Sequence, residues 1–328
     1  MKQNSQIIFL LLICLLILTT YLSLFFGGSE HINLNNLDFN NFIFWEIRFP
    51  KTVTAILAGC SLSAAGLILQ IVFRNPLAGP YVLGISSGAS LSVAISILAG
   101  SSFHVFNIFF IGKTVILASA ILGSFSITLL ILAISKKINS NVILLLIGVM
   151  LSMICGAIQN ALEYFSSANS LKSFVVWGMG SLSNTTNLDL SIYMPLTILF
   201  LIPMFFFIKP INAFILGENY AKNIGVNYSS ARFFLILISS VLTGLTTAFC
   251  GPIAFVGIAV PILSRMILKT AKQEIHFISC MLLGSIILLL SDALANSLLL
   301  HTTLPINVIT TFIGAPLIIY LMFKNKSW

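Results

Sequence analysis

The stretch "FFLILISSVLTGLTTAFCGPIAFVGIAVPILS", residues 233–264, decides the fold class because it contains no charged residue. As one α-helix it would be about 48 Å long, whereas the hydrocarbon core of a bilayer is about 30 Å thick. Gly251 and Pro252 interrupt the run near its middle, and proline cannot continue a regular helix. We therefore expect two consecutive membrane-spanning helices here.

The composition of the whole chain leads to the same class of protein. The 328 residues are 58% hydrophobic and 7% charged, whereas an ordinary soluble domain carries about 25% charged residues. The apolar runs are continuous rather than alternating, which favours helices over a β-barrel. The sequence predicts an all-α polytopic membrane protein, with a single transmembrane domain over residues 1–328 and about ten transmembrane helices. The predicted spans are 7–26, 52–73, 82–99, 114–134, 142–163, 190–208, 232–250, 253–270, 277–300 and 306–323.

The basic residues set the predicted orientation. With the N-terminus inside the cell, twelve of the sixteen Lys and Arg residues fall on the cytoplasmic side, in agreement with the positive-inside trend. Both termini are therefore expected in the cytoplasm, and the net charge of +8 indicates topology rather than nucleic-acid binding. The four on the outer side are Arg48, Lys51, Lys113 and Lys172. The twelve inner ones are Lys2, Arg74, Lys136, Lys137, Lys209, Lys222, Arg232, Arg265, Lys269, Lys272, Lys324 and Lys326.

The longest predicted inner loop, about 209–231, is unusually polar for this chain. It contains "FILGENYAKNIGVNYS" (214–229), in which Gly217 permits a tight entry and Gly225 a left-handed stop for a short helix. One face of that helix is predicted to hold Leu216, Ala221 and Ile224. From the residues alone, a solvated loop and a docking segment for a cytosolic partner both remain open.

Six blocks, taken in order, resemble the FecCD-type permeases, the membrane subunits of ABC importers for iron-siderophores, haem and vitamin B12. The similarity runs from about residue 47 to the end of the chain and implies the type II ABC importer permease fold. The blocks are "IRFPKTVTAILAGCSLSAAGLILQ" (47–70), "RNPLAGPYVLGISSGASL" (74–91), "VVWGMGSL" (175–182), "LGENYAKNIGV" (216–226), "GPIAFVGIAVPILSR" (251–265) and "LPINVITTFIGAPLIIYLM" (304–322).

The resemblance also implies partners. They are a second permease subunit (this chain itself or a paralogue), two cytosolic ATPase subunits and an extracytoplasmic binding protein, which is a lipoprotein in a Gram-positive cell. The protein is expected in the lipid of the bacterial cytoplasmic membrane, with a translocation path at the permease dimer interface and no cofactor, metal or nucleic acid. The chain lacks the GxxxxGK[ST] phosphate loop, so it is not expected to be an enzyme. The expected substrate is an iron(III)-siderophore complex, with haem and cobalamin as alternatives.

Several site residues follow from the resemblance on the cytoplasmic side. The resemblance implies that the residues after Arg74 form part of a gate. The alternative interpretation of the motif at residues 74–77 is a plain turn with an arginine that sets the topology. Contact with the ATPase is assigned to Leu216, Gly217, Glu218, Ala221, Ile224 and Gly225. The gate is assigned to Asn75, Leu77, Ser140 and Asn141.

The second predicted span and its outer end carry the remaining assignments. Gly59, Ser63 and Gln70 fall close to one helical stripe, where small residues either let helices pack closely or leave a wide path. The resemblance favours the translocation path, most directly for Gln70. It also assigns Arg48 and Lys51 to docking of the binding protein, whereas the residues alone equally suit snorkelling toward lipid headgroups.

Asp292 is the only acidic residue deep in a predicted span. Such an acid could relay protons in a secondary transporter, the rival class of function. The resemblance favours a structural hydrogen-bonding role instead. Among the positions that depart from the family pattern, Ile262 replaces a frequent His and Asn307 replaces a Gly. Asn296 stands where a third docking Arg is expected, so that contact is predicted to be missing.

Overall fold

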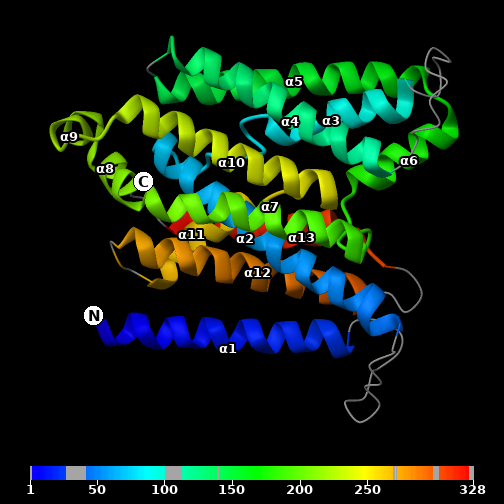
Figure 1. The fold of residues 1–328 in the computed structure, drawn as a ribbon, viewed down its shortest axis with the longest axis horizontal. Coiled ribbons are helices and arrows are strands. Elements are labelled where there is room, and N and C mark those ends of the chain that lie inside the picture. The colour runs from blue at the N-terminus through cyan, green and yellow to red at the C-terminus, as the bar shows by residue number, and fades with distance from the viewer. Residues whose placement is uncertain are drawn as a thin grey trace. The chain divides into compact units, whose positions relative to one another are not determined.

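The computed structural model describes residues 2–26, 42–99, 113–138, 140–268, 270, 272–297 and 303–324. Every regular element in these ranges is a helix, and η2 and η3 are short π-helices. In chain order they are α1 (Lys2–Phe26), η2 (Ile43–Arg48), α2 (Phe49–Phe73), α3 (Ile85–Ala94), η3 (Ile95–Ala99), α4 (Lys113–Ser135), α5 (Asn141–Phe165), α6 (Ala168–Gly178), α7 (Asn187–Phe206), α8 (Ile208–Leu216), α9 (Glu218–Asn223), α10 (Tyr228–Cys250), α11 (Val256–Leu268), α12 (Gln273–Ser297) and α13 (Ile306–Lys324) (Figure 1).

The membrane spans agree with the predicted fold class. In the part of the chain that the structure describes, seven helices are long and apolar enough to cross a membrane. Three shorter apolar helices, Ile85–Leu98, Val256–Leu268 and Ile306–Tyr320, occupy the places of three further predicted spans. The end of the ninth predicted span, 298–300, lies outside the described residues, as do Lys269 and Lys326.

The chain groups into two compact units that alternate along the sequence. The first comprises Met1–Leu67, Ser181–Leu199 and Ile253–Trp328, and the second comprises Ile68–Gly180 and Phe200–Pro252. Two of the four boundaries between them fall inside α2 and α7, and the other two fall between α6 and α7 and between α10 and α11. The prediction of one transmembrane domain stays a prediction.

In the first unit, α12 packs against α1, α11 and α13. Two glycines of α2 bring that helix close to α12 and to α11. A Cβ atom on Gly59 would collide with the backbone of Gly284 in α12, and one on Gly66 would collide with the backbone of Gly257 in α11. The small residues of the second predicted span therefore serve close helix packing at these two positions.

In the second unit, α3 lies among α4, α5 and α10, and α4 also packs along α10 (Figure 1). Small residues again mark the contacts. A Cβ atom on Gly88 of α3 would meet Ile127 and the Gly123 carbonyl of α4, and one on Gly244 of α10 would meet the Ser124 side chain. This bundle carries α8 and α9, because both pack against α10.

The predicted interruption at Gly251 and Pro252 is confirmed. Helix α10 ends at Cys250, and Gly251 has a φ of +74°. The next helix starts at Val256, three residues later than predicted, because the chain stays irregular up to Phe255, whose φ is +67°. Within the first unit, the side-chain oxygen of Asn307 accepts a hydrogen bond from the Ala254 N–H at 3.1 Å.

Candidate functional site

The predicted coupling segment, 209–231, folds as two short helices joined by a glycine. Helix α8 ends at Leu216, Gly217 takes a φ of +120°, and α9 follows at once. Gly225, with a φ of +80°, then ends the short helix in the left-handed region, as predicted. The segment is thus a tight helix–turn–helix rather than an open loop.

This segment presents an apolar surface, here called the α8–α9 patch, formed by Ile215, Leu216, Tyr220 and Ile224. Each of these side chains is between 47% and 64% exposed. Large apolar side chains that stay exposed outside the membrane-spanning helices often mark an interaction site.

The predicted position of Ala221 on this surface is wrong. Ala221 is 0% exposed, its N–H donates to the Gly217 carbonyl, and its own carbonyl accepts the Val226 N–H, both at 2.9 Å. The small side chain fills the inside of the turn instead of offering room to a partner, and Leu216 and Ile224 do not share a face with it. For Glu218 the structure describes only the backbone.

Arg74 connects the predicted gate to this segment. Its Nε and Nη2 atoms both donate to the Phe214 carbonyl in the last turn of α8, at 3.2 and 3.0 Å. A cation at a helix C-terminus is favourable because the final carbonyls lack intrahelical partners. The Arg74 backbone has a φ of +49°, a left-handed conformation that non-glycine residues rarely adopt. This contact, which joins residues 140 positions apart, was not predicted from the sequence.

Of the four predicted gate residues, Asn75 and Leu77 lie in the turn after α2, whereas Ser140 and Asn141 lie at the start of α5. One hydrogen bond joins the start of α5 to the last turn of α2. Asn75 forms a turn in which its side-chain oxygen accepts the Leu77 N–H at 2.9 Å. Ser140 caps α5 by accepting the Ile143 N–H. The amide of Asn141 donates to the Val72 carbonyl at 3.3 Å, in the last turn of α2.

The three residues assigned to the translocation path are all buried in this chain. Gly59 packs on α12, and the Ser63 hydroxyl donates to the Gly59 carbonyl at 2.6 Å. For these two residues the geometry favours the helix-packing alternative. Gln70 is also buried, and its backbone carbonyl accepts the Asn75 N–H at 3.1 Å, next to the predicted gate.

The two cations assigned to docking both have partners inside the first unit. Arg48 is buried, and its Nη1 atom donates to the carbonyls of Leu24 and Phe25 at 3.0 and 2.9 Å, in the last turn of α1. Lys51 forms an ion pair with Asp292, with 2.9 Å between the ammonium nitrogen and the carboxylate oxygen. Local sequence does not indicate this pair, because Lys51 lies just before the second predicted span and Asp292 lies within the ninth.

Ile262, Asn296 and Asn307, which depart from the family pattern, all lie in the first unit. Ile262 is buried in α11. Asn296 donates its side-chain amide to the Asp292 carbonyl at 2.7 Å, one turn below it on α12. The side-chain oxygen of Asn307 accepts the hydrogen bond from the Ala254 N–H in the irregular segment before α11. Within the described ranges, no three His, Cys, Asp or Glu side chains gather as a metal site.

Comparison with known proteins supplies the family. The profile of the FecCD transport family matches residues 7–324. The vitamin B12 import system permease protein BtuC of Pectobacterium atrosepticum is 33% identical over 321 residues, which cover 96% of this chain and 93% of that protein. A protein of Methanocaldococcus jannaschii, assigned as an ABC transporter permease, is 31% identical over 350 residues and covers 99% of both chains.

A solved structure agrees with these relatives. An ABC transporter assigned to the metal-chelate type, in an inward-facing conformation, matches with a TM-score of 0.87 and 30% identity over 97% of this chain and 99% of that one. The chain therefore belongs to the FecCD transport family, as a multi-span permease subunit of an ABC importer in the bacterial inner membrane, where separate ATPase subunits hydrolyse the ATP.

Proposed function

We propose that this permease imports an organic metal chelate, with an iron(III)-siderophore complex as the first candidate. The observation that carries the proposal is the full-length match to a structure of the metal-chelate type. Cobalamin is the second candidate, because relatives that match nearly the whole chain are named as vitamin B12 permeases. Both compounds are bulky metal complexes.

The substrate can be tested with the complete importer in proteoliposomes. The complex would contain this permease, its permease partner, the ATPase subunits and the binding protein, with ATP inside the vesicles. We expect ATP-dependent uptake of a radiolabelled iron(III)-siderophore and no uptake of the metal-free siderophore. Uptake of labelled cobalamin alone would replace the first candidate with the second, and uptake of neither chelate would contradict the proposal.

The proposed docking surface for the ATPase is the α8–α9 patch. Its exposed apolar side chains would be covered by the partner. Both termini are then cytoplasmic, as predicted from the basic residues. Arg74 would connect this patch to the turn of Asn75 and Leu77, so that closure of the ATPase dimer moves the gate.

Two substitutions on the patch provide the test. In Leu216→Glu/Ile224→Glu both side chains are exposed before the change, so the permease is expected to fold and insert normally. An unpaired charge buried at an interface costs several kcal/mol, and ~1.4 kcal/mol corresponds to a tenfold change in affinity. We expect ATPase association to fall at least tenfold, measured by co-purification and titration.

The matched control is Leu188→Glu. Leu188 is 80% exposed and lies at the opposite end of α7 from α8. This variant should bind the ATPase like the wild type. Wild-type association of the Leu216→Glu/Ile224→Glu variant would show that the segment is an ordinary solvated turn.

The proposed docking surface for the binding protein is the outer end of η2 and α2, with Arg48 and Lys51. An acidic side chain of the binding protein would have to compete with the carbonyls at the end of α1 and with Asp292. The direct contribution of each cation to docking is therefore expected to be small.

A further inference from the structure

The chain between α2 and α3, residues 74–84, forms turns and no regular helix. Pro76 and Pro80 lack a backbone N–H, and Gly84 has a φ of +78°, so a continuous helix cannot cross this segment. Asn75 and Leu77, near its start, belong to the predicted gate. The later part, 78–84, has no assigned role.

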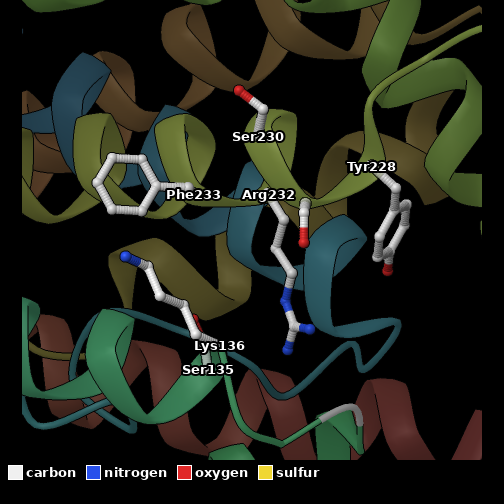
Figure 2. A pocket seen from close by; sticks show the side chains of 7 residues that line it. Ser135, Lys136, Tyr228, Ser230, Arg232 and Phe233 are labelled. Carbon is white, nitrogen blue, oxygen red and sulfur yellow. The ribbon is translucent and has the colours of Figure 1, made fainter.

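The end of the second unit that the predicted topology places in the cytoplasm is polar. The end of α4 and the start of α10 meet there at a pocket with a volume of about 350 Å³, lined in part by Ser135, Lys136 and Ser230 (Figure 2). Helix α5 begins at this same end, because Asn141 follows Lys136 by five residues. The Asn141 side chain donates to the Val72 carbonyl in the last turn of α2. The end of α2 and the start of α5 are therefore level with each other.

From that level, the segment runs along α5, which is long and apolar enough to cross a membrane. A Cβ atom on Gly148 would meet the Cα atom of Leu83, and one on Gly84 would meet the Ser152 side chain. Gly148 and Ser152 lie seven and eleven residues after Asn141, which is about 10 and 16 Å along the helix. The hydrocarbon core is about 30 Å thick. Irregular backbone thus reaches about half-way into the membrane.

Exposure within this segment is uneven. Ala78 and Leu83 are 0% exposed, whereas Tyr81 is 54% exposed. The backbone carbonyl of Tyr81 accepts the Gly84 N–H at 3.1 Å, which fixes the residue in a turn at membrane depth. Non-helical backbone at this depth is tolerated only where protein buries it or where it lines a water-filled cavity. A phenol hydroxyl in hydrocarbon would also lack a hydrogen-bond partner. The exposed face of Tyr81 therefore suits water better than lipid.

We propose that Tyr81 lines the translocation path and contacts the metal chelate next to the turn of Asn75 and Leu77. This role rests on the proposed import function and adds a substrate-contacting residue to it. A tyrosine ring offers a rigid apolar face, and its hydroxyl both donates and accepts hydrogen bonds. Both features suit a bulky organic chelate that carries polar groups. Leu77, which is 37% exposed, would lie on the cytoplasmic side of this contact.

The first test is the access of water to residue 81 in the variant Tyr81→Cys. The importer, assembled with its permease partner and ATPase subunits, is placed in lipid nanodiscs, where both membrane faces meet solvent. A thiol reacts as its thiolate, which forms in contact with water. We expect a charged thiol reagent that does not enter lipid to label Tyr81→Cys well above the wild type, whose five cysteines supply the baseline.

Leu129→Cys is the matched control. Leu129 is 47% exposed and lies six residues before the end of α4, about 9 Å from the same end of the unit. Facing lipid at a similar depth, it should stay at the baseline. Equal labelling of the two variants would overturn the proposal. So would a Tyr81→Cys variant that reacts only in the isolated permease, because a partner subunit would then cover it, or that does not react at all, because lipid would then surround it.

The second test is contact with the chelate, measured as uptake of a labelled iron(III)-siderophore and of labelled cobalamin in proteoliposomes. Tyr81→Ala should lower the maximal uptake rate of the carried chelate about fivefold, the factor that one aromatic contact contributes. The concentration of loaded binding protein at half-maximal uptake should not change, because docking takes place on the outer side. Tyr81→Phe should keep most of the rate, because the ring remains.

A wild-type rate in Tyr81→Ala, or a loss explained by a lower unfolding temperature of that variant, would remove Tyr81 from substrate contact. The two tests also separate this role from the choice of substrate. If the wild type takes up neither chelate, the proposed substrate class fails, whereas the labelling of Tyr81→Cys still decides whether residue 81 lines a water-filled path.

Discussion

At the scale of single residues, the ion pair between Lys51 and Asp292 explains an acid inside a membrane helix. The two side chains are only 12% and 10% exposed, and Asn296 contacts the backbone of the same turn. An acid that relays protons must be free to exchange its proton during each cycle, whereas this carboxylate is held in an ion pair with Lys51. The geometry therefore favours the structural role that the resemblance indicated over proton coupling.

The first prediction is an asymmetry between the two halves of this pair. Removing one member of a buried ion pair costs about 3–5 kcal/mol. Lys51→Met should destabilise the protein more than Asp292→Asn, because a lysine near a helix end can extend toward water whereas a carboxylate deeper in α12 cannot. The measurement is the thermal unfolding temperature of each variant in detergent.

The control for that prediction is the double variant Lys51→Met/Asp292→Asn, which leaves no unpaired charge and should recover most of the lost stability. Additive losses in the double variant would mean that the two side chains do not interact.

The same contacts limit what charge reversal at the outer end can reveal. Lys51→Glu would place two carboxylates together, and Arg48→Glu would remove the donor to the end of α1. Either change would disturb the first unit itself, so a loss of binding-protein docking would not identify a direct contact. Stability has to be measured beside docking in such variants.

At the scale of elements, Arg74 holds the turn after α2 against the end of α8. The guanidinium makes two hydrogen bonds to one carbonyl, which restricts its orientation more than a single bond from lysine would. Its left-handed backbone conformation costs about 1–2 kcal/mol and directs the side chain toward α8. Strain of this kind persists where the surrounding structure requires it.

The second prediction concerns this connection. Arg74→Ala should leave ATP hydrolysis by the assembled complex intact but lower substrate uptake per ATP, because the α8–α9 patch and the gate turn lose their shared contact. Arg74→Lys should give an intermediate value, because it keeps the charge and loses the two-pronged donor. The measurements are ATP hydrolysis and uptake in the same proteoliposomes.

Lys209→Ala supplies the charge control, since Lys209 is an exposed cation on α8 itself. It should preserve wild-type uptake per ATP. An unchanged ratio in Arg74→Ala would contradict the role of the connection.

The elements also show what the sequence could predict. Gly225 and Gly251 were predicted as interruptions, and both take positive φ angles, because this requirement is local and glycine satisfies it at little cost. The side on which Ala221 lies depends on how α9 packs against α8 and α10, so its small size suited a buried position as well as an exposed one. The Arg74–Phe214 and Lys51–Asp292 contacts join distant positions, which local patterns do not specify.

At the scale of the whole molecule, the all-helical class followed from the low charge content and the continuous apolar runs, because backbone polar groups in a bilayer must be satisfied internally. The grouping of those helices into two alternating units was not predicted. Helices such as α2 and α12 are adjacent because Gly59 and Gly284 fit each other's backbones. The sequence alone does not indicate this contact, because it depends on the relative position of two helices that are far apart in the chain.

The last prediction concerns the energy source of the complete importer. Separate ATPase subunits serve this family, and the paired Asp292 leaves the rival proton-coupled mechanism without its main support. Uptake into proteoliposomes loaded with ATP should therefore be unchanged when an uncoupler removes the proton gradient. The internal ATP concentration must be clamped, because in cells an uncoupler also depletes ATP. A non-hydrolysable ATP analogue should abolish uptake under the same conditions. If uptake instead collapses with the gradient while ATP stays constant, Asp292 returns as a candidate proton carrier, and Asp292→Asn should then lose coupled transport while the protein remains folded.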